Sequence, residues 1–159
     1  MLSNSLRNNS YAFLNYILKI LSIYFILVNF LSLNLTNAVA SNTIILSGGE
    51  NLNNEIAKAN AGDILLLPSE EYNGPIVIDK PLKLIGADST VILGTGKGSV
   101  ITISAPDVSV KKLKITGSGN ALETMDSGIF IDKSGDRAII EQNYIINNLF
   151  GVYLWGPND

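Results

Sequence analysis

The chain of 159 residues contains neither cysteine nor histidine. It therefore cannot form a disulfide bond, a Ser-His-Asp or Cys-His catalytic triad, or an ordinary zinc site, because Zn²⁺ is bound mostly by cysteine and histidine. Charge is also scarce: 16% of the residues are charged against 47% that are apolar, and the formal net charge is −3. This composition excludes a disordered chain and a protein that coats nucleic acid, and the length fits one domain.

Residues 1–40 contain no acidic residue, and their charged residues are Arg7 and Lys19. An apolar run over residues 20–35 follows, and the sequence Ala-Val-Ala closes the segment. This order is typical of a secretory signal peptide, so we predict a signal peptide over residues 1–40 and an exported, periplasmic domain over residues 41–159. The run is shorter than the roughly 20 residues that span a bilayer. An uncleaved N-terminal anchor is the alternative.

The exported part begins with one helical pattern and continues with short strands. Over residues 50–59, Leu52, Ile56 and Ala59 recur at helical spacing, which predicts a short amphipathic helix. Runs of three to five β-branched and aliphatic residues follow, and glycine, proline, asparagine and aspartate interrupt them. Such runs indicate short β-strands.

Four of these strands repeat the same pattern, and they begin 25, 28 and 23 residues apart, at Ile76, Ile101, Ile129 and Val152. Two further sets of strands lie between them in the same order. Three strands in each period of this length are typical of a parallel β-helix. We therefore predict an all-β fold, a right-handed parallel β-helix (solenoid) of about four coils. The short helix would cap its N-terminal end, and we expect a C-terminally truncated stack because no cap follows the last strand.

In this register two columns of side chains face outward on one sheet. The first contains Val77, Thr102, Phe130 and Tyr153, and the second contains Asp79, Ser104, Asp132 and Trp155. Exposed rings beside carboxylates predict a surface that binds glycans or a partner protein, with Phe130, Tyr153, Trp155, Asp79 and Asp132 as its candidate residues. The alternative is that stacked residues only stabilise their neighbours.

The two carboxylates in the second column argue against catalysis. Asp79 and Asp132 are expected to lie two coils, roughly 10 Å, apart. This separation is too large for a retaining glycosidase pair and at the limit for an inverting one. We therefore predict no catalytic residues and no enzyme activity.

Three other polar patterns have structural interpretations. The glycine-rich segment 94–99 resembles a phosphate loop in composition but lacks the required spacing, which favours a tight corner. Lysines 111, 112 and 114 favour a solvated face. Asparagines 143, 147 and 148 lie at strand ends, where asparagine tolerates a left-handed backbone and can form ladders between coils.

The order and spacing of seven motifs resemble the NosD family. These motifs are AGDILLLP, YNGPIVIDKPLKLIG, GKGSV, APDVSV, LKITGSG, SGIF and NLFGVY, within residues 61–153. The resemblance implies a right-handed β-helix that serves as a periplasmic accessory protein for the maturation of nitrous oxide reductase. It would assist copper supply to the catalytic copper–sulfide centre, together with a membrane ABC transporter (ATPase plus permease) and a copper donor protein.

Copper is implied by this resemblance only. Cu(I) prefers cysteine, methionine and histidine, and Met125 is the one such residue in the exported part. We therefore name no metal ligand and expect no cofactor in the chain itself and no nucleic-acid partner. The alternative function is a secreted β-helix protein that binds or cleaves polysaccharide.

Overall fold

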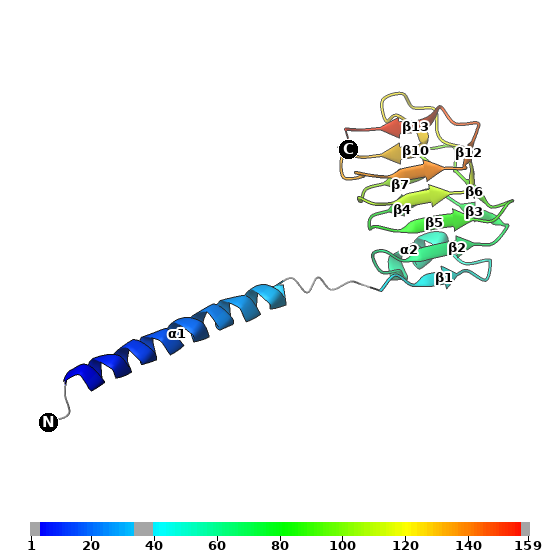
Figure 1. The fold of residues 1–159 in the computed structure, drawn as a ribbon. Coiled ribbons are helices and arrows are strands. Elements are labelled where there is room, and N and C mark those ends of the chain that lie inside the picture. The colour runs from blue at the N-terminus through cyan, green and yellow to red at the C-terminus, as the bar shows by residue number, and fades with distance from the viewer. Residues whose placement is uncertain (1–3, 34–39, 157–159) are drawn as a thin grey trace. The chain divides into compact units, whose positions relative to one another are not determined.

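The computed structural model describes residues 4–33 and 40–156, with side chains for residues 13–27 and 40–156. The chain divides into two compact units, residues 1–38 and residues 39–159 (Figure 1). The first unit contains one helix, α1 (Asn4–Leu33). No helix in the described part of the chain is both long and apolar enough to cross a membrane. Most of the predicted cleavage motif lies outside the described residues, so the signal peptide stays a prediction.

The second unit is a parallel β-solenoid of about five turns, with three sheets along its sides (Figure 1). Sheet A contains β1 (Thr43–Ile45), β2 (Ile64–Leu67), β5 (Lys83–Gly86), β8 (Ser109–Lys111) and β11 (Ile139–Glu141). Sheet B contains β3 (Glu71–Asn73), β6 (Val91–Leu93), β9 (Lys114–Thr116) and β12 (Tyr144–Ile145). Sheet C contains β4 (Ile76–Ile78), β7 (Ile101–Ile103), β10 (Ser127–Ile131) and β13 (Phe150–Leu154). These pairings confirm the predicted parallel β-helix. The stack has about five turns and not the expected four, because β1 adds a strand before the first predicted turn.

The register of sheet C is the one that the sequence predicts. Ile76 pairs with Ile101, Ile101 with Ile129, and Ile129 with Val152. The first three of these side chains are fully buried, because alternate residues of a strand point to the same side of the sheet. Burial of each isoleucine stabilises the fold by about 1.5–3 kcal/mol.

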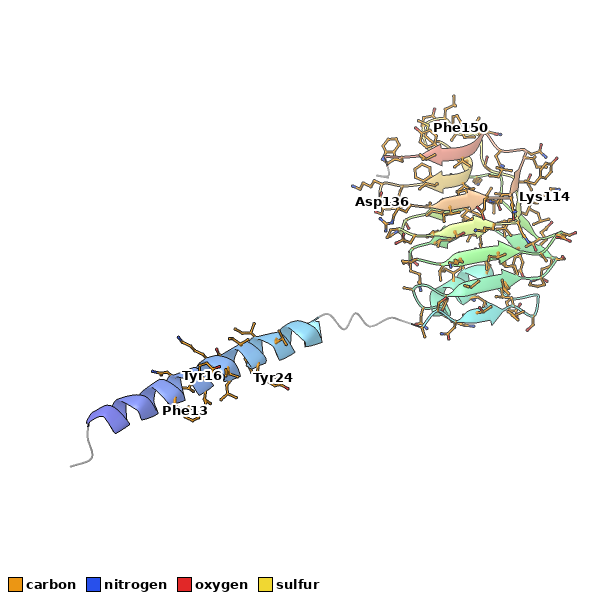
Figure 2. All side chains as sticks on the ribbon, in the orientation of Figure 1. Phe13, Tyr16, Tyr24, Lys114, Asp136 and Phe150 are labelled. Atoms are coloured by element: carbon orange, nitrogen blue, oxygen red, sulfur yellow. The ribbon has the colours of Figure 1, made fainter. Side chains whose placement is uncertain are left out.

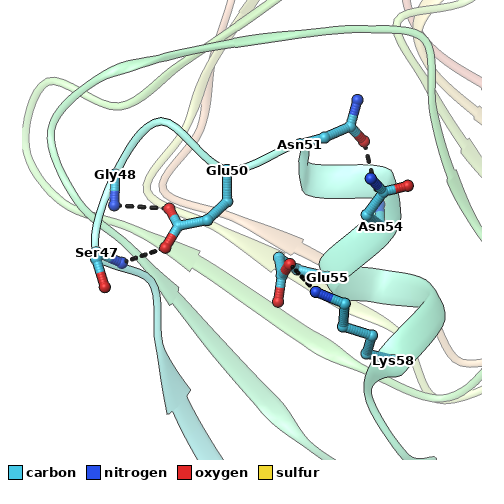
Figure 3. A network of polar contacts seen from close by, with 7 residues as sticks. All are labelled: Ser47, Gly48, Glu50, Asn51, Asn54, Glu55 and Lys58. Atoms are coloured by element: carbon cyan, nitrogen blue, oxygen red, sulfur yellow. Dashed lines mark hydrogen bonds and ion pairs between the residues drawn. The ribbon is translucent and has the colours of Figure 1, made fainter.

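The N-terminal end of the solenoid is covered by α2 (Leu52–Lys58), within the range predicted for a helix. Its N-cap Asn51 accepts a hydrogen bond from the amide of Asn54 at 3.1 Å (Figure 3), and Leu52 and Ile56 are buried in the core. The side-chain amide of Asn53 pairs with the edge of β4: it donates to the carbonyl of Pro75 at 2.8 Å and accepts from the amide of Val77 at 3.2 Å. The helix therefore occupies the place of a further strand beside β4.

Two strands differ from the prediction. The sequence pattern indicated no strand at β1 and none at β3, which begins at Glu71. Only Tyr72 of β3 is buried, and its neighbours Glu71 and Asn73 are exposed. A strand with a single inward side chain has too short an apolar pattern to be recognised, and the hydrogen bonds to β6 decide its conformation.

Candidate functional site

The outer side of sheet C brings together the predicted aromatic residues. Val77, Thr102, Phe130 and Tyr153 are successive partners along the sheet. The rings of Phe130 and Tyr153 stack, with centroids 5.8 Å apart and planes at 11°. The ring of Phe150, which is labelled in Figure 2, lies 5.6 Å from that of Tyr153 and is tilted by 50°. We call these three residues the ring cluster.

Phe150 is a member that the sequence did not predict. It lies three residues before Tyr153, and strict alternation along β13 would place the two side chains on opposite sides of the sheet. The only available signal was the aromatic residue at the start of the last strand.

The second predicted column continues directly after the strands of sheet C. The backbone amides of Ser104, Asp132 and Trp155 each donate a hydrogen bond to a carbonyl of the preceding solenoid turn, at 2.9, 3.0 and 2.7 Å. The column therefore runs along the solenoid in the order Asp79, Ser104, Asp132 and Trp155. Asp79 is exposed, and 55% of the Trp155 surface is exposed. Asp132 accepts a hydrogen bond from the amide of Ser134 at 2.7 Å, which holds its carboxylate in a turn.

This arrangement offers binding chemistry. Asp79 and Asp132 are separated by the turn that carries Ser104, which corresponds to roughly 10 Å between carboxylates. The rings supply apolar contact area, and the carboxylates supply acceptors at the margin. Such a face can bind a protein or a glycan.

Soft metal ligands are scarce at this face and elsewhere in the solenoid. Within residues 40–156, no group of three or more His, Cys, Asp and Glu residues could hold a metal ion. Met125 lies in a turn with a φ of 53°, and its carbonyl accepts a hydrogen bond from the hydroxyl of Ser127. One thioether does not make a Cu(I) site, so the described residues do not fit a resident copper ion.

A groove of about 720 Å³ lies on the outer side of sheet B. It is lined by Asp88, Ser89, Val91, Lys112, Leu113, Lys114, Gln142 and Tyr144. Lys114, labelled in Figure 2, and Tyr144 are partners on neighbouring strands. Lys112 and Gln142 occupy corners with φ of 56° and 58°. Lys111, the third lysine of the sequence pattern, instead forms an ion pair with Glu141.

Two of the three asparagines join neighbouring coils through hydrogen bonds to the backbone and not to one another. Asn143 accepts from the amide of Leu113 at 3.0 Å and donates to the carbonyl of Val110 at 2.7 Å. Asn148 accepts from the amide of Ser118 at 3.0 Å, and Asn147 adopts the left-handed conformation, with a φ of 52°. The glycine-rich segment 94–99 forms a corner that leads into β7 rather than into a helix.

Comparison with known proteins agrees with the motifs. No family model matches the chain. The "Probable ABC transporter binding protein NosD" of Stutzerimonas stutzeri is 39% identical over 93 residues, which cover 58% of this chain and 21% of that relative. A protein of the same name from Pseudomonas aeruginosa is 42% identical over 66 residues, which cover 42% of this chain and 61% of that relative.

Over the matched residues, the chain is similar to these NosD proteins. The match covers about a fifth of the length of the Stutzerimonas stutzeri relative. Among solved structures, a pectin methylesterase in complex with a hexasaccharide superposes with a TM-score of 0.60, at 22% identity, over 74% of this chain and 46% of that protein. This likeness concerns the β-solenoid fold alone.

Proposed function

We propose that this chain is a member of the NosD family and a periplasmic accessory protein for the maturation of nitrous oxide reductase. It assists copper supply to the reductase's catalytic copper–sulfide centre and acts together with a membrane ABC transporter (ATPase plus permease) and a copper donor protein. The match to relatives named as binding proteins of an ABC transporter carries this proposal. The protein acts by binding and not by catalysis.

The outer side of sheet C is the proposed docking surface. The ring cluster and Trp155 give it an apolar centre, and Asp79 and Asp132 give it an acidic margin. Large aromatic residues with polar surroundings provide most of the binding energy in protein interfaces. Copper is cargo in this scheme and is held by partners, because the described residues lack a set of soft ligands.

Deletion of the gene tests the accessory role. We expect a deletion strain to make reductase with depleted copper, measured by metal analysis of the purified enzyme. The intact gene should restore copper, whereas Tyr153→Ala and Trp155→Ala should restore it poorly. Ile139→Ala, which truncates an exposed apolar side chain on sheet A, is the control and should behave as wild type. Copper-replete reductase in the deletion strain would refute the proposal.

A second candidate function is binding of an acidic polysaccharide, and the groove on sheet B favours it. Lys112 and Lys114 would pair with carboxylates, and the exposed ring of Tyr144 would stack on a sugar. Uronate oligomers should then raise the melting temperature, and Tyr144→Ala or Lys114→Ala should abolish the shift. Lys83→Ala, an exposed lysine on sheet A, is the control. No shift with any uronate oligomer would count against this function.

A further inference from the structure

The groove on sheet B has an uneven distribution of charge along the solenoid. Its lining comes from successive coils that follow one another in the stack. The first of these coils contributes Asp88, the next contributes Lys112 and Lys114, and the last contributes Gln142 and Tyr144. The charge along the groove therefore changes from negative to positive to neutral.

Both lysines belong to one coil, and hydrogen bonds from the coils on either side fix its backbone. The side-chain amide of Asn143, in the following coil, accepts from the amide of Leu113 at 3.0 Å and donates to the carbonyl of Val110 at 2.7 Å. The amide of Lys114 donates to the carbonyl of Thr90, in the preceding coil, at 2.9 Å. The two ammonium groups are thus attached to a rigid corner of the solenoid.

These two lysines are not neutralised by neighbouring side chains. The adjacent Lys111 pairs with Glu141, whereas no ion pair among the described residues includes Lys112 or Lys114. Both side chains are exposed. Two unpaired ammonium groups at one corner of a groove attract an anionic group, which would form charge-assisted hydrogen bonds with them.

The preceding coils present negative charge at the N-terminal side of the groove. Asp88 lies in a turn that Thr90 closes, because the hydroxyl of Thr90 accepts from the amide of Ala87 at 2.9 Å. Glu71 is exposed on β3, and no ion pair among the described residues includes Asp88 or Glu71. A second anionic group on this side would therefore be repelled, since neighbouring coils are only about 4.8 Å apart.

A groove that followed a chain of carboxylates would show a different pattern. A polyuronate has one carboxylate on each sugar, so a matching groove would have a basic side chain on successive coils. In the column of Lys114, the partner in the preceding coil is Val91 and the partner in the following coil is Tyr144. The groove therefore offers one anion subsite beside one exposed ring.

We propose that this groove binds the end of a uronate chain. The carboxylate of the terminal sugar lies between Lys112 and Lys114, the sugar stacks on Tyr144, and the rest of the chain extends away from Asp88. Asp88 determines the specificity, because an internal sugar at the lysines would bring the carboxylate of its neighbour beside Asp88. The inference rests on the second candidate function, the binding of an acidic polysaccharide, and adds which part of the polysaccharide is bound.

Isothermal titration of the full chain with galacturonate oligomers of different length tests this inference. The wild type should bind the dimer and the hexamer with equal affinity per chain, because each chain has one end of the required direction. Asp88→Asn should raise the affinity for the hexamer by about threefold to sixfold, because internal sugars can then bind, and that for the dimer by at most about twofold. Asp79→Asn, which removes an exposed carboxylate on sheet C, is the control and should change neither.

Lysine variants separate the chain-end inference from the underlying function. Lys112→Ala and Lys114→Ala should each weaken binding of the dimer by about threefold to tenfold, whereas Lys83→Ala on sheet A should not. The dimer with both carboxylates methyl-esterified should not bind. No binding of any galacturonate oligomer would overturn both the second candidate function and this inference. If wild-type affinity rose with chain length, or if Asp88→Asn left the affinity for the hexamer unchanged, the chain-end inference alone would be wrong.

Discussion

Sheets B and C share one interior but have very different outer sides. Both contribute fully buried isoleucines to the core, such as Ile92 and Ile101. The outer side of sheet C has stacked aromatic rings with carboxylates at the margin, whereas that of sheet B has two lysines and one exposed tyrosine around a groove. The difference teaches that packing restricts only every second residue of a solenoid strand. The alternate residues, which point outward, can determine what each outer side binds.

The largest effect should come from the shared interior. Ile101→Ala removes a fully buried side chain at the centre of sheet C and should lower the free energy of unfolding by about 2–5 kcal/mol. Thr102→Ala changes the adjacent outward residue and should stay within about 0.5 kcal/mol. Chemical denaturation measures both. Equal effects would mean that the inward and outward positions do not differ as described.

The ring cluster should contribute to stability as well as to binding. Tyr153→Ala removes contacts with Phe130 and Phe150, and we expect a loss of about 0.5–1.5 kcal/mol in the free energy of unfolding. Tyr144→Ala on sheet B is the matched control: that residue is 63% exposed and makes no ring contact among the described residues. If Tyr144→Ala lowered the free energy of unfolding as much as Tyr153→Ala, the two outer sides would not differ as described.

Acid should weaken the solenoid through its turns and not through either face. Asp63 accepts hydrogen bonds from the amides of Asn42 and Asn60, at 2.9 and 2.8 Å, and these bonds lower its pKa. A lowered pKa in the folded state stabilises the protein above the ordinary carboxyl pKa, and that stabilisation is lost as the pH falls below about 4.

Denaturation at several pH values measures this effect. Asp63→Asn should be less stable than wild type at neutral pH, and the difference should shrink in acid. Asp79→Asn, which changes an exposed carboxylate on sheet C, is the control. A difference between wild type and Asp63→Asn that does not depend on pH would contradict the assigned role.

The smallest effect is expected at the border between sheets A and B. Lys111 and Glu141 form an ion pair in which both side chains are partly exposed to solvent, and such pairs contribute about 0–1 kcal/mol. Glu141→Gln should therefore change the free energy of unfolding little, and added salt should remove the remaining difference. A loss above about 1 kcal/mol would show that this border is coupled to the core.

The sequence predicted the register of sheet C because its strands repeat the same alternation at Ile76, Ile101, Ile129 and Val152. It did not predict the groove on sheet B, because that groove depends on left-handed corners at Lys112 and Gln142, which are not glycines. Phe150 was missed because alternation places it opposite Tyr153. These failures share one cause: corners and loops bring residues together without a repeating pattern.

The capping helix also makes contacts that the sequence did not predict. Helical spacing predicted α2 and its buried Leu52 and Ile56. No pattern could show that the side chain of Asn53 would face β4, or that the amide of Gly49 would donate to Glu70. These contacts depend on how the loop over residues 46–51 folds back over the first strands, which a single sequence does not encode as periodicity.

The amide of Asn53 has a consequence for how the protein behaves in a crowded compartment. A bare strand edge can recruit strands from other chains and so start aggregation. The side chain of Asn53 forms hydrogen bonds with a carbonyl and an amide at the edge of β4. These two groups are then not available to another strand, and the side chain presents no new row of donors and acceptors. The edge of β4 therefore offers no free template of this kind even when many copies of the protein meet.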